Sequence, residues 1–163
     1  MAPVDRHRVL LDRGGVAEGL VVSSRQQGSS SPGDGARELG LLLSHVLVGA
    51  GRHCRGEILS GGFFVRSLAA SDLVSLVTAT LPAERETLLD VLDPLRRFEL
   101  VYPEIAREID ELSRAETLAA ARGLLALAER ELRNTRPEFP WHALDVVRDH
   151  LPDEHPRGPG GGG

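Results

Sequence analysis

The sequence contains no lysine. All 19 of the Lys and Arg residues counted in this 163-residue chain are arginine. Arginine presents a planar set of donors, which favours paired contacts with carboxylate or phosphate groups over diffuse attraction. Acids outnumber the arginines, and 24 Asp and Glu residues give a net charge of -5 and a pI of about 5.7. This balance argues against a nucleic-acid-binding protein, for which a basic surface is expected.

Cysteine is almost absent as well, since Cys54 stands alone. A single cysteine excludes an intramolecular disulfide and suits a reducing compartment. No apolar run approaches the length of about 18 residues that a membrane-spanning helix needs. The N-terminus also lacks a charged region followed by an apolar one, so no secretion signal is expected. The sequence therefore predicts a cytoplasmic protein without membrane contact.

The glycine and proline content, 18 and 10 residues, divides the chain into segments. Residues 1–35 predict a short strand pair, at 8–12 and 20–22, followed by a flexible linker over 26–35. The glycine- and serine-containing run from Gly28 to Asp34 lacks the lysine ending of a phosphate-binding loop and is interpreted as linker. Residues 152–163, rich in glycine, predict a disordered tail. The segment between them, 36–151, predicts one folded domain.

This central segment shows the three- and four-residue spacing of apolar residues that is typical of amphipathic helices. A first helix starts near Ala36, and a second runs from Glu57 to about Thr80 and ends before Pro82. Asp93 and Pro94 form a helix-start signal. Ser113 and Glu116 fit a capping box, and a last short helix covers 141–150. The expected apolar positions are Leu39, Leu42, Leu43, Val46 and Leu47, then Leu68, Leu73, Leu76 and Val77, then Ile105, Ile109 and Leu112, and finally Leu118, Ala121, Leu125, Ala128 and Leu132.

Several apolar helices joined by short loops predict an all-α fold, a bundle of four to six helices around one core. Phe98 and Tyr102 are four residues apart and are expected to pack together at a helix corner.

A polar cluster separates the first two helices, and its members are the candidate binding residues Arg52, His53, Arg55 and Glu57. Arg52 and Arg55 are three residues apart, a spacing that lets two arginines hold one anion. Glu57 either orients a cationic ligand or caps the helix that follows it. No catalytic residue, metal site or cofactor is predicted here.

The histidines and Cys54 have plainer interpretations. Zinc sites need four ligands at short loop spacings, and those spacings are missing. His45 is expected to be partly buried and His53 to lie on the surface. His53 and Cys54 are neighbours on a helix and point about 100° apart, which disfavours a nucleophile–base pair.

The run from His45 to Leu76, with Arg55, Gly56 and Glu57 opening the second helix, resembles the C-terminal helical domain of lincosamide- and aminoglycoside-type nucleotidyltransferases. The segment from Arg96 to Glu104 is also similar to a later part of such domains, and the strand at 9–14 to the strand that precedes them. The resemblance covers about residues 36–151. The family's catalytic domain carries a Gly-Ser motif followed by an Asp-x-Asp pair that holds magnesium. Here Gly28 and Ser29 are followed only by Asp34, so that catalytic half is missing.

The resemblance implies a non-catalytic helical domain on the substrate side of such an enzyme, truncated or supplied with a separate catalytic subunit. Glu57 would support a general base, and dimer contacts are expected. The expected partners are a small polar ligand, a catalytic subunit or a second copy. The alternative is a stand-alone structural or regulatory module that acts by protein–protein association. A small enzyme using His53 or Cys54 is the third interpretation.

Overall fold

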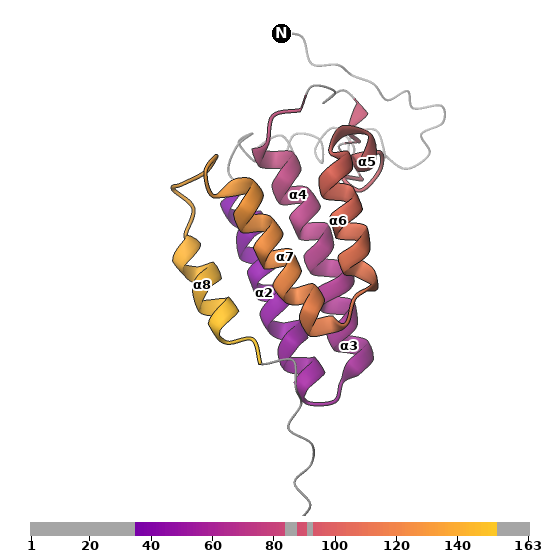
Figure 1. Cartoon of the computed structure of the whole chain (residues 1–163), viewed down its shortest axis with the longest axis vertical. Helices are drawn as coiled ribbons and strands as arrows, with labels where there is room; N and C mark the ends of the chain where they lie inside the picture. The colour runs from indigo at the N-terminus through magenta and orange to yellow at the C-terminus, as the bar shows by residue number, and fades with distance from the viewer. Residues whose placement is uncertain (1–34, 84–87, 91–92, 153–163) are drawn as a thin grey trace, which may run out of the picture. The chain divides into compact units, whose positions relative to one another are not determined.

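The computed structural model describes residues 35–83, 88–90 and 93–152 (Figure 1). The predicted strand pair at 8–12 and 20–22, the linker over 26–34 and the tail beyond Pro152 lie outside these residues. The helices are α2 (Ala36–Cys54), α3 (Ile58–Phe63), the π-helix η1 (Phe64–Ala69), α4 (Ala70–Thr80), α5 (Phe98–Val101), α6 (Pro103–Arg114), α7 (Thr117–Leu132) and α8 (Trp141–Asp149). Because α3, η1 and α4 form one continuous helix over Ile58–Thr80, we call that segment the α3–α4 rod.

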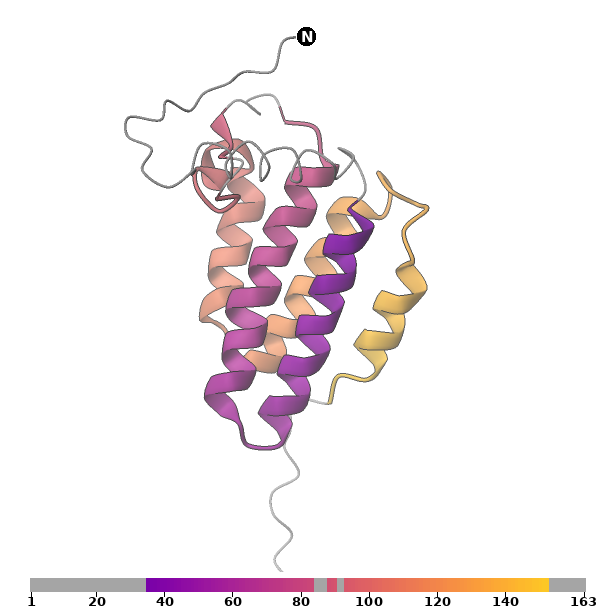
Figure 2. The same ribbon diagram turned by 180° about the vertical axis from the view of Figure 1, so that it is seen from behind.

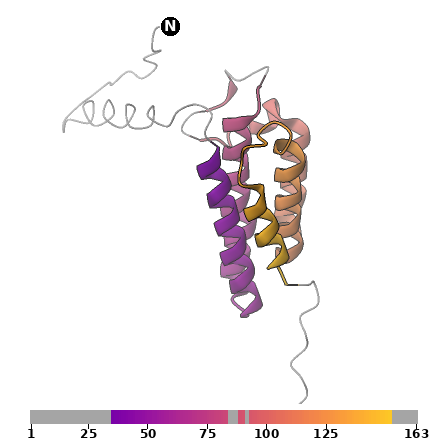
Figure 3. The same cartoon turned by 90° about the vertical axis from the view of Figure 1, so that its left-hand side faces the viewer.

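The helices form an all-α bundle, as the sequence predicts. Two antiparallel pairs make up its body: α2 with the α3–α4 rod, and α6 with α7 (Figures 1 and 2). α8 lies along the seam between α2 and α7, which Figure 3 shows from its own side.

One hydrophobic core joins these helices, and α7 is its centre. All five predicted stripe residues of α7, from Leu118 to Leu132, are buried. α7 packs against α2, η1, α4, α6 and α8. Ile105 and Ile109 of α6 are buried as predicted. On α2, Leu39, Leu42, Leu43 and Val46 are buried, but Leu47 is exposed, because it lies one position beyond the buried stripe.

The close approach of α2 and α3 depends on glycine. Gly49 and Gly61 face one another where the two helices meet, and a Cβ on Gly61 would lie 2.8 Å from the Gly49 carbonyl oxygen. The turn between the helices contains Gly56 at φ 85°, in the left-handed region that favours glycine.

Two predicted helix starts are wrong. Asp93 and Pro94 begin a turn, in which the Asp93 side chain accepts a hydrogen bond from the Leu95 amide at 3.2 Å. Arg97 then has φ 66°, a left-handed conformation that cannot continue a right-handed helix, so α5 begins only at Phe98. Ser113 does not cap a helix either, because it lies inside α6 and donates to the Ile109 carbonyl at 2.8 Å.

The Phe98–Tyr102 contact is confirmed, with ring centroids 5.1 Å apart. The Tyr102 hydroxyl donates to the Leu81 carbonyl at 2.8 Å. This bond ties the α5–α6 corner to the end of the α3–α4 rod.

Candidate functional site

The four predicted binding residues lie close together in the chain, but their side chains reach different partners. Arg55 and Glu57 pair with each other, with Arg55 Nε 3.1 Å from Glu57 Oε1, on the exposed turn after α2. Glu57 occupies the N-cap position of α3, yet its side chain makes no capping hydrogen bond. Glu57 therefore lies at the start of α3, as the capping interpretation requires, but without a capping hydrogen bond, and the ligand role of Arg55 and Glu57 stays a prediction.

Arg52 turns towards the α3–α4 rod and away from Arg55. Its Nη1 donates to Ser60 Oγ at 2.6 Å, and its guanidinium lies 4.4 Å from the centre of the Phe64 ring. A cation over an aromatic face is attracted by the ring's quadrupole. Arg52 is half-buried, and no described carboxylate forms an ion pair with it. The two arginines do not converge on one point.

His53 is not the surface residue that the sequence predicts. Its ring is half-buried, its Nε2 lies 3.0 Å from Glu116 Oε1, and its Nδ1 has no hydrogen-bond partner among the described residues. The second carboxylate oxygen of Glu116 accepts from the amides of Leu118 and Ala119, at 2.8 and 3.4 Å. Glu116 is therefore the N-cap of α7 and ties α7 to the end of α2.

A second histidine pair, missed by the sequence reasoning, lies between α2 and α4. His45 Nδ1 and Asp72 Oδ2 are 2.5 Å apart, and their side chains are 25% and 16% exposed. Burial is the main cause that raises the pKa of the Asp72 carboxyl, while its hydrogen bond to His45 acts in the opposite direction. The pair is 27 residues apart in the chain, so no local spacing indicates it. Among the described residues none hydrogen-bonds to His45 Nε2.

Phe64 joins this pair to Arg52. The rings of Phe64 and His45 lie edge to face, with centroids 5.6 Å apart and planes at 70°, and the Arg52 guanidinium lies over the Phe64 ring. Phe63 packs edge-on against Phe64 at 6.3 Å. A polar pair, a cation and two aromatic rings thus share one region of the surface.

Helix spacing extends this region into two parallel rows. On α2 one row has spacings of four, three and four residues, which keep its members along one side of a helix. On the rod the spacings are four, five and four, because the π-helix η1 places residues five apart on one side. We call these rows, with Phe64, the α2–α4 face: Leu41, His45, Val48 and Arg52 from α2, and Leu59, Phe63, Phe64, Leu68 and Asp72 from the rod.

The α2–α4 face is apolar and exposed at its α3 end. Leu59, Phe63 and Val48 are 89%, 56% and 41% exposed. Charge is scarce around them, because residues 58–80 contain only Arg66 and Asp72 as charged residues, and residues 39–51 contain no Arg, Asp or Glu. Surface apolar residues that cluster in this way mark contact sites more often than scattered ones do.

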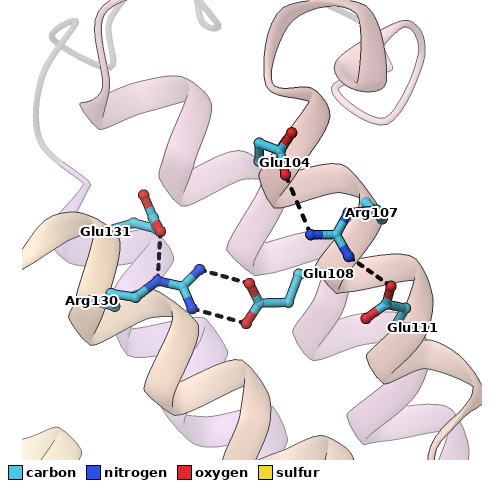
Figure 4. A network of polar contacts seen from close by, with 6 residues as sticks. All are labelled: Glu104, Arg107, Glu108, Glu111, Arg130 and Glu131. Atoms are coloured by element: carbon cyan, nitrogen blue, oxygen red, sulfur yellow. Dashed lines mark hydrogen bonds and ion pairs between the residues drawn. The ribbon is translucent and has the colours of Figure 1, made fainter.

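The α6–α7 surface is charged instead (Figure 4). Arg130 of α7 forms two hydrogen bonds with Glu108 of α6, at 3.1 and 2.7 Å, and a third with Glu131 at 2.8 Å. Arg107 bridges Glu104 and Glu111 along α6. The hydrogen bonds from Arg130 hold the pKa of Glu108 below its ordinary value. Because each charge there has a partner, this network is interpreted as a solvated surface that links two helices.

Glu129 offers a test of how much such ion pairs stabilise the fold. It pairs with Arg148 of α8 and with Arg133, and the Arg148 hydrogen bond is the largest cause that lowers its pKa below the ordinary 4.5. A carboxyl group whose pKa is lower in the folded state stabilises that state when the pH is above the pKa of the unfolded chain. This stabilisation is lost as the pH falls through the lower pKa of the folded state. Glu129→Gln is expected to lower the free energy of unfolding by about 1 kcal/mol at pH 7.

That loss is expected to shrink as the pH falls below 4.5. Denaturant melts at several pH values measure it, with Glu99→Gln as the control, an exposed acid that has no ion pair among the described residues. A loss that stays constant down to acid pH contradicts an electrostatic origin.

Cys54 is exposed at the end of α2. The ring of its neighbour His53 contacts Glu116, so the structure gives no nucleophile–base pair there. In the described part of the chain, no group of three His, Cys, Asp or Glu residues is placed to hold a metal ion.

The α3–α4 rod is long and apolar enough to cross a membrane by length and composition alone. In its most apolar window 44% is buried inside the bundle, and core helices of soluble proteins pass the same test. The prediction that the chain does not contact a membrane therefore stays a prediction.

No protein-family model, curated protein or solved structure matches this chain. The resemblance to nucleotidyltransferases therefore stays a prediction from the sequence.

Proposed function

We propose that this chain is a non-catalytic helical domain that binds another protein through its α2–α4 face. The observation that supports it most is the exposure of Leu59, Phe63 and Val48 on a surface nearly free of charge. The centres of protein interfaces are depleted in charged residues and enriched in aromatic ones and arginine, as this face is. The ion pairs of α6 and α7 make the other surface a poorer candidate, since exposed charges favour water.

The polar groups of the face fit this function too. His45 bonds to Asp72, and Arg52 bonds to Ser60. Polar groups that already have partners can be covered at lower cost than unpaired ones. The resemblance to nucleotidyltransferases would make a catalytic domain on a separate chain one partner for this face.

Photocrosslinking in the chain's own cells tests the proposal. A photoreactive phenylalanine analogue at Phe63 is expected to form a covalent adduct with a protein, identified by mass spectrometry. The same analogue at Val146 is the matched control, because Val146 is 52% exposed but lies on α8. Adducts at Val146 as abundant as those at Phe63, or none at either, would contradict binding through this face.

A further inference from the structure

We propose that the partner of the α2–α4 face is a second copy of this chain, and that the two faces meet with the His45–Asp72 pairs inside the contact. This inference rests on the function proposed above and names its partner. In the commonest symmetric dimers the same patch of each subunit meets itself, so the patch has to be compatible with its own copy.

The distribution of charge is the main argument for a second copy. Residues 36–80, which form α2 and the α3–α4 rod, contain four arginines and three acids. Residues 81–152 contain ten arginines and fifteen acids. A nearly neutral face can meet its copy without repulsion between like charges, whereas a strongly charged face cannot.

Symmetry adds to this argument. When two α2–α4 faces meet, the acidic α6–α7 surfaces of the copies point away from each other. A contact through α6 and α7 would bring the surplus of acids together instead. The face-to-face arrangement thus separates the like charges that would oppose association.

The shape and the chemistry of the α2–α4 face also suit a contact between two copies. The two rows of side chains run along the antiparallel α2 and α3–α4 rod (Figure 2), and Phe63 and Leu59 are exposed at the α3 end. Outside the two rows, α2 and α4 expose or half-expose small residues, among them Ser44, Ser71 and Ser75, which allow close approach of another helix. When the rows of one copy contact those of the other, α2 and the α3–α4 rod of the second copy would form another layer of helices on the bundle.

A lipid surface fits the face less well. The inner side of the α3–α4 rod is taken up by the core, where Leu73, Leu76 and Val77 are buried. The chain has no lysine, and its net charge is -5. Attachment to anionic membranes is favoured by clusters of basic residues, which this face lacks.

The His45–Asp72 pair gives the dimer a distinct pH dependence. With one proton shared, the pair carries no net charge, whereas after its loss the pair carries one negative charge. The charged groups that act on Asp72 are His45, Arg37 and Glu38 of α2, and Arg52 lies across Phe64. Arg37 and Glu38 pair with each other at 3.3 Å, and they act on the pKa of Asp72 in opposite directions, Arg37 lowering it and Glu38 raising it.

Burying a charged pair in the contact costs more than burying a neutral one. The dimer is therefore expected to weaken as the pH rises.

Analytical ultracentrifugation of the full chain tests the inference. The expected species at pH 6 has twice the mass of 17.6 kDa and dissociates on dilution. Leu59→Glu and Phe63→Glu are expected to give monomers with unchanged helix content by circular dichroism, since both side chains are exposed. Val146→Glu, on α8, is the control that should remain a dimer. The double variant His45→Gln with Asp72→Asn should dimerise without the pH dependence.

Three results would overturn the inference. The first is a wild-type chain that stays monomeric at all concentrations. The second is a dimer that survives both Leu59→Glu and Phe63→Glu. The third is a chain that co-sediments with phosphatidylcholine–phosphatidylglycerol vesicles and forms no dimer. A monomer whose Phe63 position crosslinks to a different protein in cells would overturn the second-copy partner and leave the proposed function standing.

Discussion

Replacing Leu125 with alanine is expected to lower the free energy of unfolding by about 2–5 kcal/mol, the range usual for a fully buried leucine. Leu125 lies in the middle of α7 and is completely buried. α7 packs against five other helical elements, so no single helix can move in to fill the space. The lost side chain therefore leaves a cavity, which adds to the loss of apolar burial.

A denaturant melt followed by circular dichroism measures the effect. Leu100→Ala in α5 is the matched control, because that leucine is exposed, and a change within about 0.5 kcal/mol is expected for it. A loss under about 0.5 kcal/mol for Leu125→Ala would mean that α7 buries another side.

The predicted stripe residues of α7 are all buried, and this agreement has a physical reason. Leu118, Leu125 and Leu132 recur at a seven-residue spacing, with alanines between them on the same side of the helix. The apolar stripe of such a helix faces the core, so local spacing identifies the stripe, although Leu124 and Leu127 beside it are buried as well. The pair of Phe98 and Tyr102 was equally local, since residues four apart on a helix are neighbours.

The wrong predictions about side-chain positions concern residues where helices end or meet. Arg52 and Arg55 share a side only if the helix continues, but α2 ends at Cys54 and Arg55 is already in the turn. His53 is half-buried because α3 folds back against it at Gly61, whose missing side chain leaves room for the His53 backbone. The end of one helix and the return of the next depend on tertiary packing, which periodicity does not report.

The candidate site was missed for the same reason. His45 and Asp72 belong to different helices, and the π-helix η1 adds a residue per turn before Asp72. The side to which Asp72 points depends on that insertion, and a π-turn has no clear sequence signal. The sequence predicted Arg52 as a binding residue, but not that Phe64 would connect it to His45.

Gly61→Ala is expected to be the other strongly destabilising change. A Cβ on Gly61 would lie 2.7 Å from the His53 backbone nitrogen and 2.8 Å from the Gly49 carbonyl oxygen. Both atoms belong to the backbone of α2, so no side-chain rotation can make room. α2 and α3 have to move apart, at a cost of about 1–3 kcal/mol, which exceeds the gain of up to about 1 kcal/mol from alanine's higher helix propensity.

Gly40→Ala is the matched control for Gly61→Ala, because it makes the same change inside a helix with no atom within 4 Å of the new Cβ. It is expected to leave the protein as stable as before or to stabilise it by up to about 1 kcal/mol. Thermal and denaturant melts of the two variants separate the steric effect from the propensity effect. Equal stabilities for both would show that α2 and α3 do not pack this closely. Because Arg52 bonds to Ser60 across the same contact, Gly61→Ala is also expected to weaken the dimer, while Gly40→Ala, clear of that contact, should not.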